Sequence, residues 1–178
     1  MGYITTFTGK HFNPLDPKPD LLDLVDIAHA LSLTCRAAGH VKTFYSVGQH
    51  SIACAREAEA RGYSQKVKLL CLLHDASEAY LVDVPRPLKP ELGSYLKIEE
   101  KLLDMIWVKF VGSIPNEDEL RKIKEIDDQM MSYEFLRLMP EELNSDYDKI
   151  ISRPSCKTNN PQNVEADFLR DYLYYMRK

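Results

Sequence analysis

A run of five apolar residues, LLCLL at positions 69–73, is the feature that most constrains the fold of this chain. In a helix, five consecutive positions point to every side of the axis, so other elements must surround this segment. The run leads directly into His74 and Asp75, and Glu78 follows one turn later. Because a buried carboxylate must neutralise, pair or bind a metal, we expect a central helix whose partly enclosed end carries chemistry.

Apolar residues recur at helical spacing through most of the chain, and capping signals divide the pattern into segments. Ser46 with Gln49 and Asn116 with Glu119 have the spacing of a capping box. The sequence predicts about six helices, which cover residues 24–38, 46–62, 64–81, 94–111, 116–139 and about 161–178.

The remaining segments are shorter or poorly patterned. The β-branched and aromatic residues of 3–12 predict a small hairpin. A connection that starts at Asn144 has room for one short helix. We therefore predict one all-α helical bundle over residues 1–178, with its core in 24–139 and the C-terminal helix packed on it. The aromatic face of that helix is assigned to the core, with a homodimer interface as the alternative; it comprises Val164, Phe168, Tyr172 and Tyr175.

Composition excludes several classes of function. The net charge is −4 and no long basic run is present, which argues against DNA or RNA as the main partner. A small phosphorylated substrate needs only one or two local cations and stays compatible. The four cysteines form no CxxC pair, which indicates a reduced, cytoplasmic protein. No segment has the apolar length that a membrane span requires.

Four residues on three predicted helices are candidate metal ligands: His50, His74, Asp75 and Asp127. Asp127 shares a stripe with isoleucine and methionine and is the inward acid of its pair, whereas Asp128 faces Lys124 one turn earlier, as in an ordinary exposed ion pair. Two imidazoles and two carboxylates suit one divalent ion such as Mn, Fe, Co, Zn or Ni. With no thiolate in the set, we expect an open hydrolytic centre rather than a closed structural zinc site.

Further polar residues follow these candidates, and each has an ordinary explanation when it is taken alone. Asp83 is explained as an ordinary turn residue. Arg36 is explained either as a cation that stabilises a helix C-terminus or as a side chain that binds phosphate. Arg86 and Lys89 lie among prolines and are predicted to be surface cations, although Lys89 is kept as a candidate substrate contact.

The ordered set of motifs resembles the HD-domain metal-dependent phosphohydrolases. The segments HDASEAYLVDVPRPLK, YSVGQHS after Arg36, and KEIDD are similar to those of bacterial 5′-deoxynucleotidases and related phage deoxynucleoside triphosphate hydrolases. The resemblance spans roughly residues 26–134. It implies that the four candidate ligands hold the metal, that Glu78 and Asp83 activate water and protonate the leaving group, and that Arg36 binds phosphate. In the deoxynucleotidases a tryptophan follows this arginine; here the residue is Ala37, which leaves selectivity for the sugar open.

The resulting expectation is hydrolysis of a (deoxy)nucleoside 5′-monophosphate with one divalent metal ion, which is Mn, Co, Fe, Zn, Ni or Mg. A first alternative is release of triphosphate from a deoxynucleoside triphosphate, which requires Arg86 and Lys89 to point inward. A second is a metal- or nucleotide-binding helical module without turnover. A third is a helical interaction protein that binds no metal.

Overall fold

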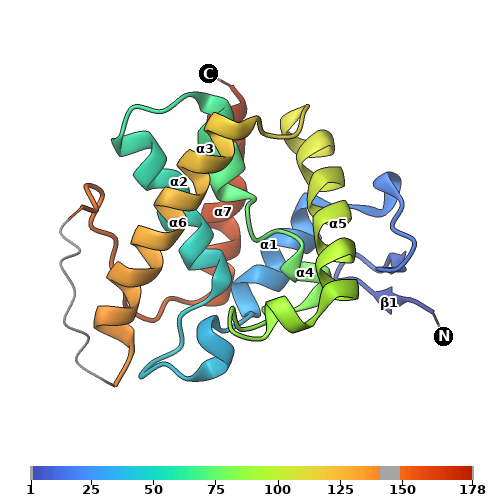
Figure 1. The fold of residues 1–178 in the computed structure, drawn as a ribbon, viewed down its shortest axis with the longest axis horizontal. Helices are drawn as coiled ribbons and strands as arrows, with labels where there is room; N and C mark the ends of the chain where they lie inside the picture. Colours follow the sequence, from blue (N-terminus) through green and yellow to red (C-terminus); the bar gives the residue numbers. More distant parts are fainter. Residues whose placement is uncertain (1, 141–148, 178) are drawn as a thin grey trace.

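The computed structural model describes residues 2–140 and 149–177, and this part of the chain is helical with one small hairpin (Figure 1). Its helices and strands are β1 (Ile4–Thr5), β2 (His11–Phe12), η1 (Pro19–Leu21), α1 (Leu24–Leu33), η2 (Arg36–Gly39), α2 (Val47–Ala60), α3 (Gln65–Leu72), α4 (Glu78–Leu81), η3 (Lys89–Glu91), α5 (Gly93–Val111), α6 (Glu117–Leu138) and α7 (Pro161–Met176). β1 and β2 pair antiparallel. The predicted all-α fold with an N-terminal hairpin is confirmed.

The predicted capping signals form as expected. Ser46 and Gln49 make a reciprocal capping box at the start of α2, and Asn116 and Glu119 make another at the start of α6. At the end of α5, Gly112 has a φ of 94°, a conformation that favours glycine. These local contacts explain why sequence alone located the ends of the long helices.

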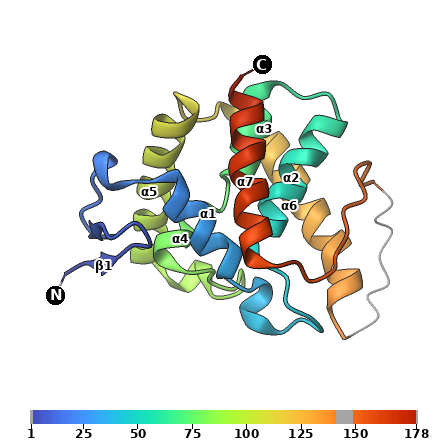
Figure 2. The same cartoon turned by 180° about the vertical axis from the view of Figure 1, so that it is seen from behind.

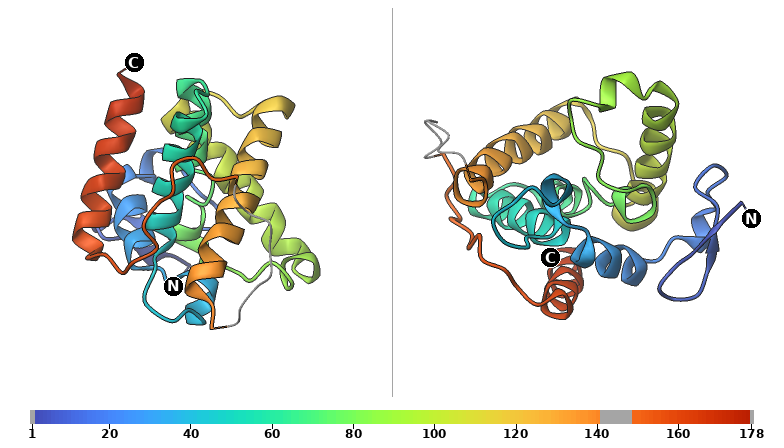
Figure 3. Two further views of the ribbon diagram at one scale, coloured as in Figure 1. Left: turned by 90° about the vertical axis from the view of Figure 1, so that its left-hand side faces the viewer. Right: turned by 90° about the horizontal axis from the view of Figure 1, so that it is seen from below.

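The helices pack in a group around α3, with α5 to one side. α2 packs on α3, α6 contacts both, and α7 lies along α1 on the far side of the molecule (Figures 1 and 2). α5 contacts α3, and near its end the Phe110 carbonyl accepts from the Tyr172 hydroxyl of α7 at 2.9 Å, while most of α5 stands apart in the side and bottom views (Figure 3). The end of α3 therefore lies between the main group of helices and α5.

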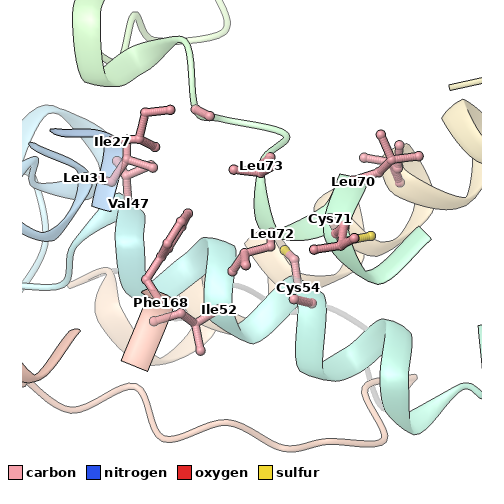
Figure 4. Packing of buried hydrophobic residues seen from close by; sticks show 14 of the residues in the cluster. Ile27, Leu31, Val47, Ile52, Cys54, Leu70, Cys71, Leu72, Leu73 and Phe168 are labelled. Atoms are coloured by element: carbon pink, nitrogen blue, oxygen red, sulfur yellow. The ribbon is translucent and has the colours of Figure 1, made fainter. Parts of the chain in front are cut away.

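The LLCLL run forms the centre of the core, as predicted. All five residues are buried, and Figure 4 shows four of them beside Ile52 and Cys54 of α2 and Phe168 of α7. Burying a leucine of this kind stabilises the fold by about 1.5–3 kcal/mol. Val164, Phe168 and Tyr175 are also buried, which assigns the predicted face of α7 to the core.

The prediction of one continuous helix over 64–81 was wrong. α3 ends at Leu72, a turn follows, and the short α4 begins at Glu78. In a continuous helix the carbonyl of Cys71 would accept from the backbone of Asp75. Here it accepts from the ring Nδ1 of His74 at 2.8 Å, and the turn continues with tighter backbone bonds three residues apart. The break points His74 and Asp75 away from the α3 axis.

The first helix also ends earlier than predicted. It stops at Leu33 rather than residue 38, and Arg36 lies in the separate turn η2. The hydroxyl of Thr34 donates to the carbonyl of Ala30 at 2.9 Å beside the backbone bond from its own N–H, a contact that often bends a helix. The chain then pairs with the residues before α2, where the Arg36 N–H donates to the Tyr45 carbonyl.

Two further predictions concern the rest of the chain. Part of the predicted connection, residues 144–148, lies outside the described residues, and 149–160 contain no helix. Every helix within 2–140 and 149–177 is too short or too polar to cross a bilayer.

Candidate metal centre

His50 lies on α2, and one of its ring nitrogens is hydrogen-bonded to a carboxylate. Its side chain is fully buried, and its Nδ1 lies 2.9 Å from Oε2 of Glu134 on α6. The hydroxyl of Tyr45 donates to the other oxygen of Glu134 at 3.1 Å. Since a carboxylate accepts, Nδ1 carries a hydrogen, and Nε2 is directed to Asp127 on the other side of the ring.

His74 is oriented in the same way by the backbone. Its Nδ1 lies 2.8 Å from the carbonyl oxygen of Cys71, which can only accept, so Nδ1 donates. Its Nε2 is buried and has no hydrogen-bond partner among the described residues. Both histidines thus donate through Nδ1, as metal-binding histidines commonly do, and both turn Nε2 toward the aspartates.

The two Nε2 atoms and two carboxylates converge on one region. His50 Nε2 lies 3.1 Å from Asp127 Oδ1 and 3.9 Å from Asp75 Oδ2. His74 Nε2 lies 3.2 Å from Asp75 Oδ2 and 3.7 Å from Asp127 Oδ1. Ligands about 2.1 Å from one ion are separated by about 3.0–3.5 Å, so these spacings fit a metal centre. The structure brings together all four residues predicted to be ligands.

The carboxylates of this cluster are held in their ionised form. Burial alone would raise the pKa of Asp75, but the charge and hydrogen bond of His74 outweigh it and hold the pKa below its usual range. The pKa of Asp127 is lowered in the same way, against burial, by its contacts with His50 and His74. Both groups are therefore ionised at neutral pH.

Cys54 is a possible ligand that sequence reasoning missed. Its Sγ lies 3.6 Å from His50 Nε2, and the buried side chains of His50, Cys54 and His74 could together hold a metal ion. Burial, followed by the charges of Asp127 and Glu134, raises the pKa of its thiol well above the usual value. Its position four residues after His50 on α2 is a signal that the sequence did contain.

Glu134 and Arg36 contact the histidine and aspartate residues of the cluster. The Arg36 side chain is buried, with Nη1 3.6 Å from Asp75 Oδ2 and Nε 3.9 Å from Glu134 Oε2. Arg36 therefore reaches the cluster from η2, although it is not on the helix predicted for it. Glu134 was missed as a functional residue; its signal was its place on the same stripe of α6 as Asp127.

Glu78 and Asp83 flank the cluster from α4 and the loop after it. Burial, followed by the charges of Asp75 and Asp83, raises the pKa of Glu78 to about 9. Burial also raises the pKa of Asp83. Between them, Val82 has a φ of 83°, a strained conformation for a β-branched residue, and redirects the chain after α4.

Arg86 is an exposed cation, as predicted, whereas Lys89 is partly buried, and both make ion pairs with acids at the cluster. Arg86 donates to Asp127 Oδ2 at 2.5 Å and to Asp128 Oδ1 at 2.7 Å. Lys89 is partly buried, 2.8 Å from Glu99 and 3.9 Å from Glu78. The turn after α4 brings this loop over the cluster, which periodicity could not foresee. The predicted pair between Lys124 and Asp128 is confirmed at 2.7 Å.

Two cavities meet at Asp75, Glu78 and Lys89. The first, of about 410 Å³, we call the loop pocket; its other lining residues include Arg36, Ala37, Asp83, Arg86, Asp127 and Phe135. The second, of about 580 Å³, we call the α5 pocket; its lining includes His74, Glu99, Leu103, Trp107, Ile114 and Leu120. Both volumes lie within the range of about 300–1,000 Å³ that is usual for small-molecule sites.

Comparisons with known proteins find relatives but no activity. Over 110 residues the chain is 42% identical to the uncharacterized protein YfdR of Escherichia coli (strain K12); the match covers 62% of this chain and 59% of YfdR. An uncharacterized protein of Rhodobacter capsulatus is 33% identical over 109 residues, which are 58% of this chain and 55% of that protein. The match thus spans little more than half the length of these curated relatives. No protein-family model matches the chain.

Proposed function

We propose that this protein is a metal-dependent phosphohydrolase of the HD-domain kind that acts on a (deoxy)nucleoside 5′-monophosphate. The observation that carries the proposal is the pair of histidines locked with Nε2 toward two ionised aspartates, His50 and His74 toward Asp75 and Asp127. The donor set fits one divalent ion of the Mn, Fe, Co, Zn, Ni or Mg group. Such an ion supplies a Lewis acid that polarises the phosphoryl group and acidifies water.

Glu78 and Asp83 handle the proton in this proposal. The raised pKa of Glu78, about 9, means that this carboxyl group holds a proton at neutral pH and can give it to a leaving oxygen. Its Oε2 is buried without a hydrogen-bond partner among the described residues, so it is available to substrate or water. Asp83, which lines the loop pocket beside it, orients the reacting water.

Arg36 binds the phosphoryl group in the loop pocket. A buried guanidinium keeps its charge and offers paired donors that match phosphate oxygens. Ala37, which also lines this pocket, leaves space where the resembling deoxynucleotidases carry a tryptophan. We therefore propose that both ribose and deoxyribose substrates are accepted.

A second candidate function has one specific observation in its favour. Arg86 and Lys89 line the loop pocket together with Arg36, as hydrolysis of a deoxynucleoside triphosphate would require. The variant Arg86→Ala separates the two candidates. If the protein hydrolyses triphosphates, Arg86→Ala lowers kcat/KM for triphosphates at least tenfold more than for monophosphates. If it hydrolyses monophosphates, the variant changes kcat/KM for the two kinds of substrate alike.

The test is a product assay on metal-free protein supplied separately with Mn, Co, Mg or Zn. Nucleoside mono- and triphosphates are offered in turn, and inorganic phosphate and triphosphate are measured separately. Release of phosphate from monophosphates supports the proposal. Tight metal or nucleotide binding with no product from any substrate would establish the non-catalytic module instead, and failure to bind any metal would leave only a helical interaction protein.

The setting proposed for this reaction is the cytoplasm. All four cysteines, Cys35, Cys54, Cys71 and Cys156, are free thiols in the structure. A reducing compartment keeps such thiols intact. A homodimer remains a proposal that sedimentation of the metal-loaded protein tests.

A further inference from the structure

The α5 pocket adjoins the loop pocket at Asp75, Glu78 and Lys89, but neither Arg36 nor Arg86 lines it. It lies between α5, the residues that follow it, and the first turn of α6, and it reaches His74, Asp75 and Glu78. In Figure 1, α5 stands across from α3 and α6, and the pocket residues come from α5, the start of α6, and the turn and short helices that follow α3. Much of the wall is apolar: Leu96, Leu103, Trp107, Ile114, Pro115 and Leu120.

Trp107 lines the pocket and has a buried polar atom without a hydrogen-bond partner among the described residues. The residue is only 7% exposed, and its indole Nε1 is buried with no hydrogen-bond partner among residues 2–140 and 149–177. Native proteins rarely leave a buried donor unpaired, so such a group indicates an acceptor supplied by a ligand or an ordered water. Glu78, on the same wall, also has an unpartnered buried oxygen.

The balance of charge differs between the two pockets: the loop pocket has three Arg or Lys side chains with four acids, and the α5 pocket has one with five. The loop pocket contains both Arg36 and Arg86, whereas neither arginine lines the α5 pocket. The α5 pocket instead carries Glu99, Glu100 and Asp104, and the one lysine on its wall, Lys89, is already bound to Glu99. Phosphate oxygens are therefore repelled from the α5 pocket, and a neutral, flat group with N–H donors is favoured.

We propose that the α5 pocket is the subsite for the nucleobase of the substrate. Trp107 Nε1–H donates to a ring acceptor, and the acidic wall accepts from an exocyclic amino group. Bases with an amino group are preferred over uracil and thymine, because the N–H of the latter is flanked by carbonyl oxygens that the carboxylates repel. This inference rests on the proposed function for the place of the phosphate, since it puts the phosphate at the cluster and the base under α5.

Trp107 is the single tryptophan of the chain, so its fluorescence reports directly on this pocket. Adenosine and uridine are titrated into the full-length, metal-loaded protein. Because these nucleosides carry no phosphate, binding is measured without turnover. We expect a saturable change in emission with adenosine, at a Kd at least fivefold lower than with uridine.

Leu120→Glu tests the wall of the pocket, and Val108→Glu is its matched control. Leu120 is 45% exposed and lines the pocket, whereas Val108 is 55% exposed on α5 and does not. We expect Leu120→Glu to weaken adenosine binding at least tenfold and to lower kcat/KM for AMP but not for ribose 5-phosphate, which lacks a base. Val108→Glu should change neither quantity.

The two proposals fail in distinguishable ways. Phosphate release from AMP with no saturable change in Trp107 emission, or with equal affinity in Leu120→Glu, overturns the base subsite and leaves the phosphohydrolase intact. Saturable adenosine binding that Leu120→Glu abolishes, with no phosphate released from any nucleotide, supports the subsite and overturns the proposed hydrolysis. Equal binding of uridine and adenosine overturns the preference for an amino group.

Discussion

The carboxylate of Glu134 lies 2.9 Å from the Nδ1 of His50, so an acid on α6 sets the orientation of a histidine that comes 84 residues earlier. Tyr45 fixes the second oxygen of the same carboxylate at 3.1 Å. The carboxylate accepts the Nδ1 hydrogen, which turns Nε2 toward Asp75 and Asp127. Glu134 is thus a positioning residue for the proposed metal centre.

Glu134→Gln should weaken metal binding about 10–100-fold, because an amide replaces the charged acceptor that fixes the tautomer of His50. Metal affinity is measured by competition with a chelator, and circular dichroism checks the fold. Glu125→Gln, an exposed acid on the same helix, is the control and should keep its affinity. Unchanged affinity in Glu134→Gln would show that the contact with His50 does not support a metal.

The adjacent acids on α6 offer a test of ligand identity. Asp127→Asn should lower metal affinity more than about 100-fold and remove activity, since loss of a direct ligand exceeds the usual effect of its supporting partners. Asp128→Asn should keep the metal, because Asp128 is directed to Lys124 and Arg86. The metal content of each variant after dialysis measures how well it retains the ion. Equal retention of metal by the two variants would exclude Asp127 from the ligand set.

Glu78→Gln separates catalysis from metal binding. The variant should keep its metal, since Glu78 is not in the ligand cluster, but kcat should fall about 10²–10⁴-fold because the transferable proton is lost. Both quantities are measured on the same preparation, with Glu91→Gln as a control at an exposed position nearby. Turnover at the wild-type level would refute the role of Glu78.

A buried acid far from the cluster predicts how stability varies with pH. Glu57 on α2 is fully buried; it accepts from the backbone N–H and hydroxyl of Ser152 at 2.9 and 2.7 Å and from Arg61 at 2.8 Å. Burial alone would raise its pKa, but these hydrogen bonds outweigh it and lower the pKa from the ordinary value of 4.5. Its stabilisation is therefore complete above pH 4.5 and is lost as pH falls through the lower folded-state value.

Glu57→Gln should consequently reduce the free energy of unfolding at pH 7 by about 1.5–3 kcal/mol, the usual contribution of hydrogen bonds to a charged group. Urea denaturation at pH 7 and at pH 3 measures the difference. The difference in the free energy of unfolding between variant and wild type should be smaller at pH 3 than at pH 7. A difference that is constant with pH would mean that the ionised form of Glu57 contributes nothing specific.

Sequence alone determined the parts of this protein that depend on neighbours within a few turns of the chain. Helical periodicity predicted the long helices, the capping boxes at Ser46 and Asn116 located two of their starts, and the LLCLL run located the core. Residue chemistry also predicted the four cluster residues, because two acids and two histidines on apolar helices need a shared partner.

Tertiary structure decided the contacts between residues that are distant in sequence. Helical periodicity does not predict the break after Leu72 or the hydrogen bond between His50 and Glu134. It also does not predict that the Cys54 thiol lies against the His50 ring, or that Arg86 donates to Asp127. Each depends on how helices pack and how a proline-rich loop returns over them. Local propensity acts over a few residues, whereas the electrostatics of the site arise from residues as far apart in sequence as Arg36 and Glu134.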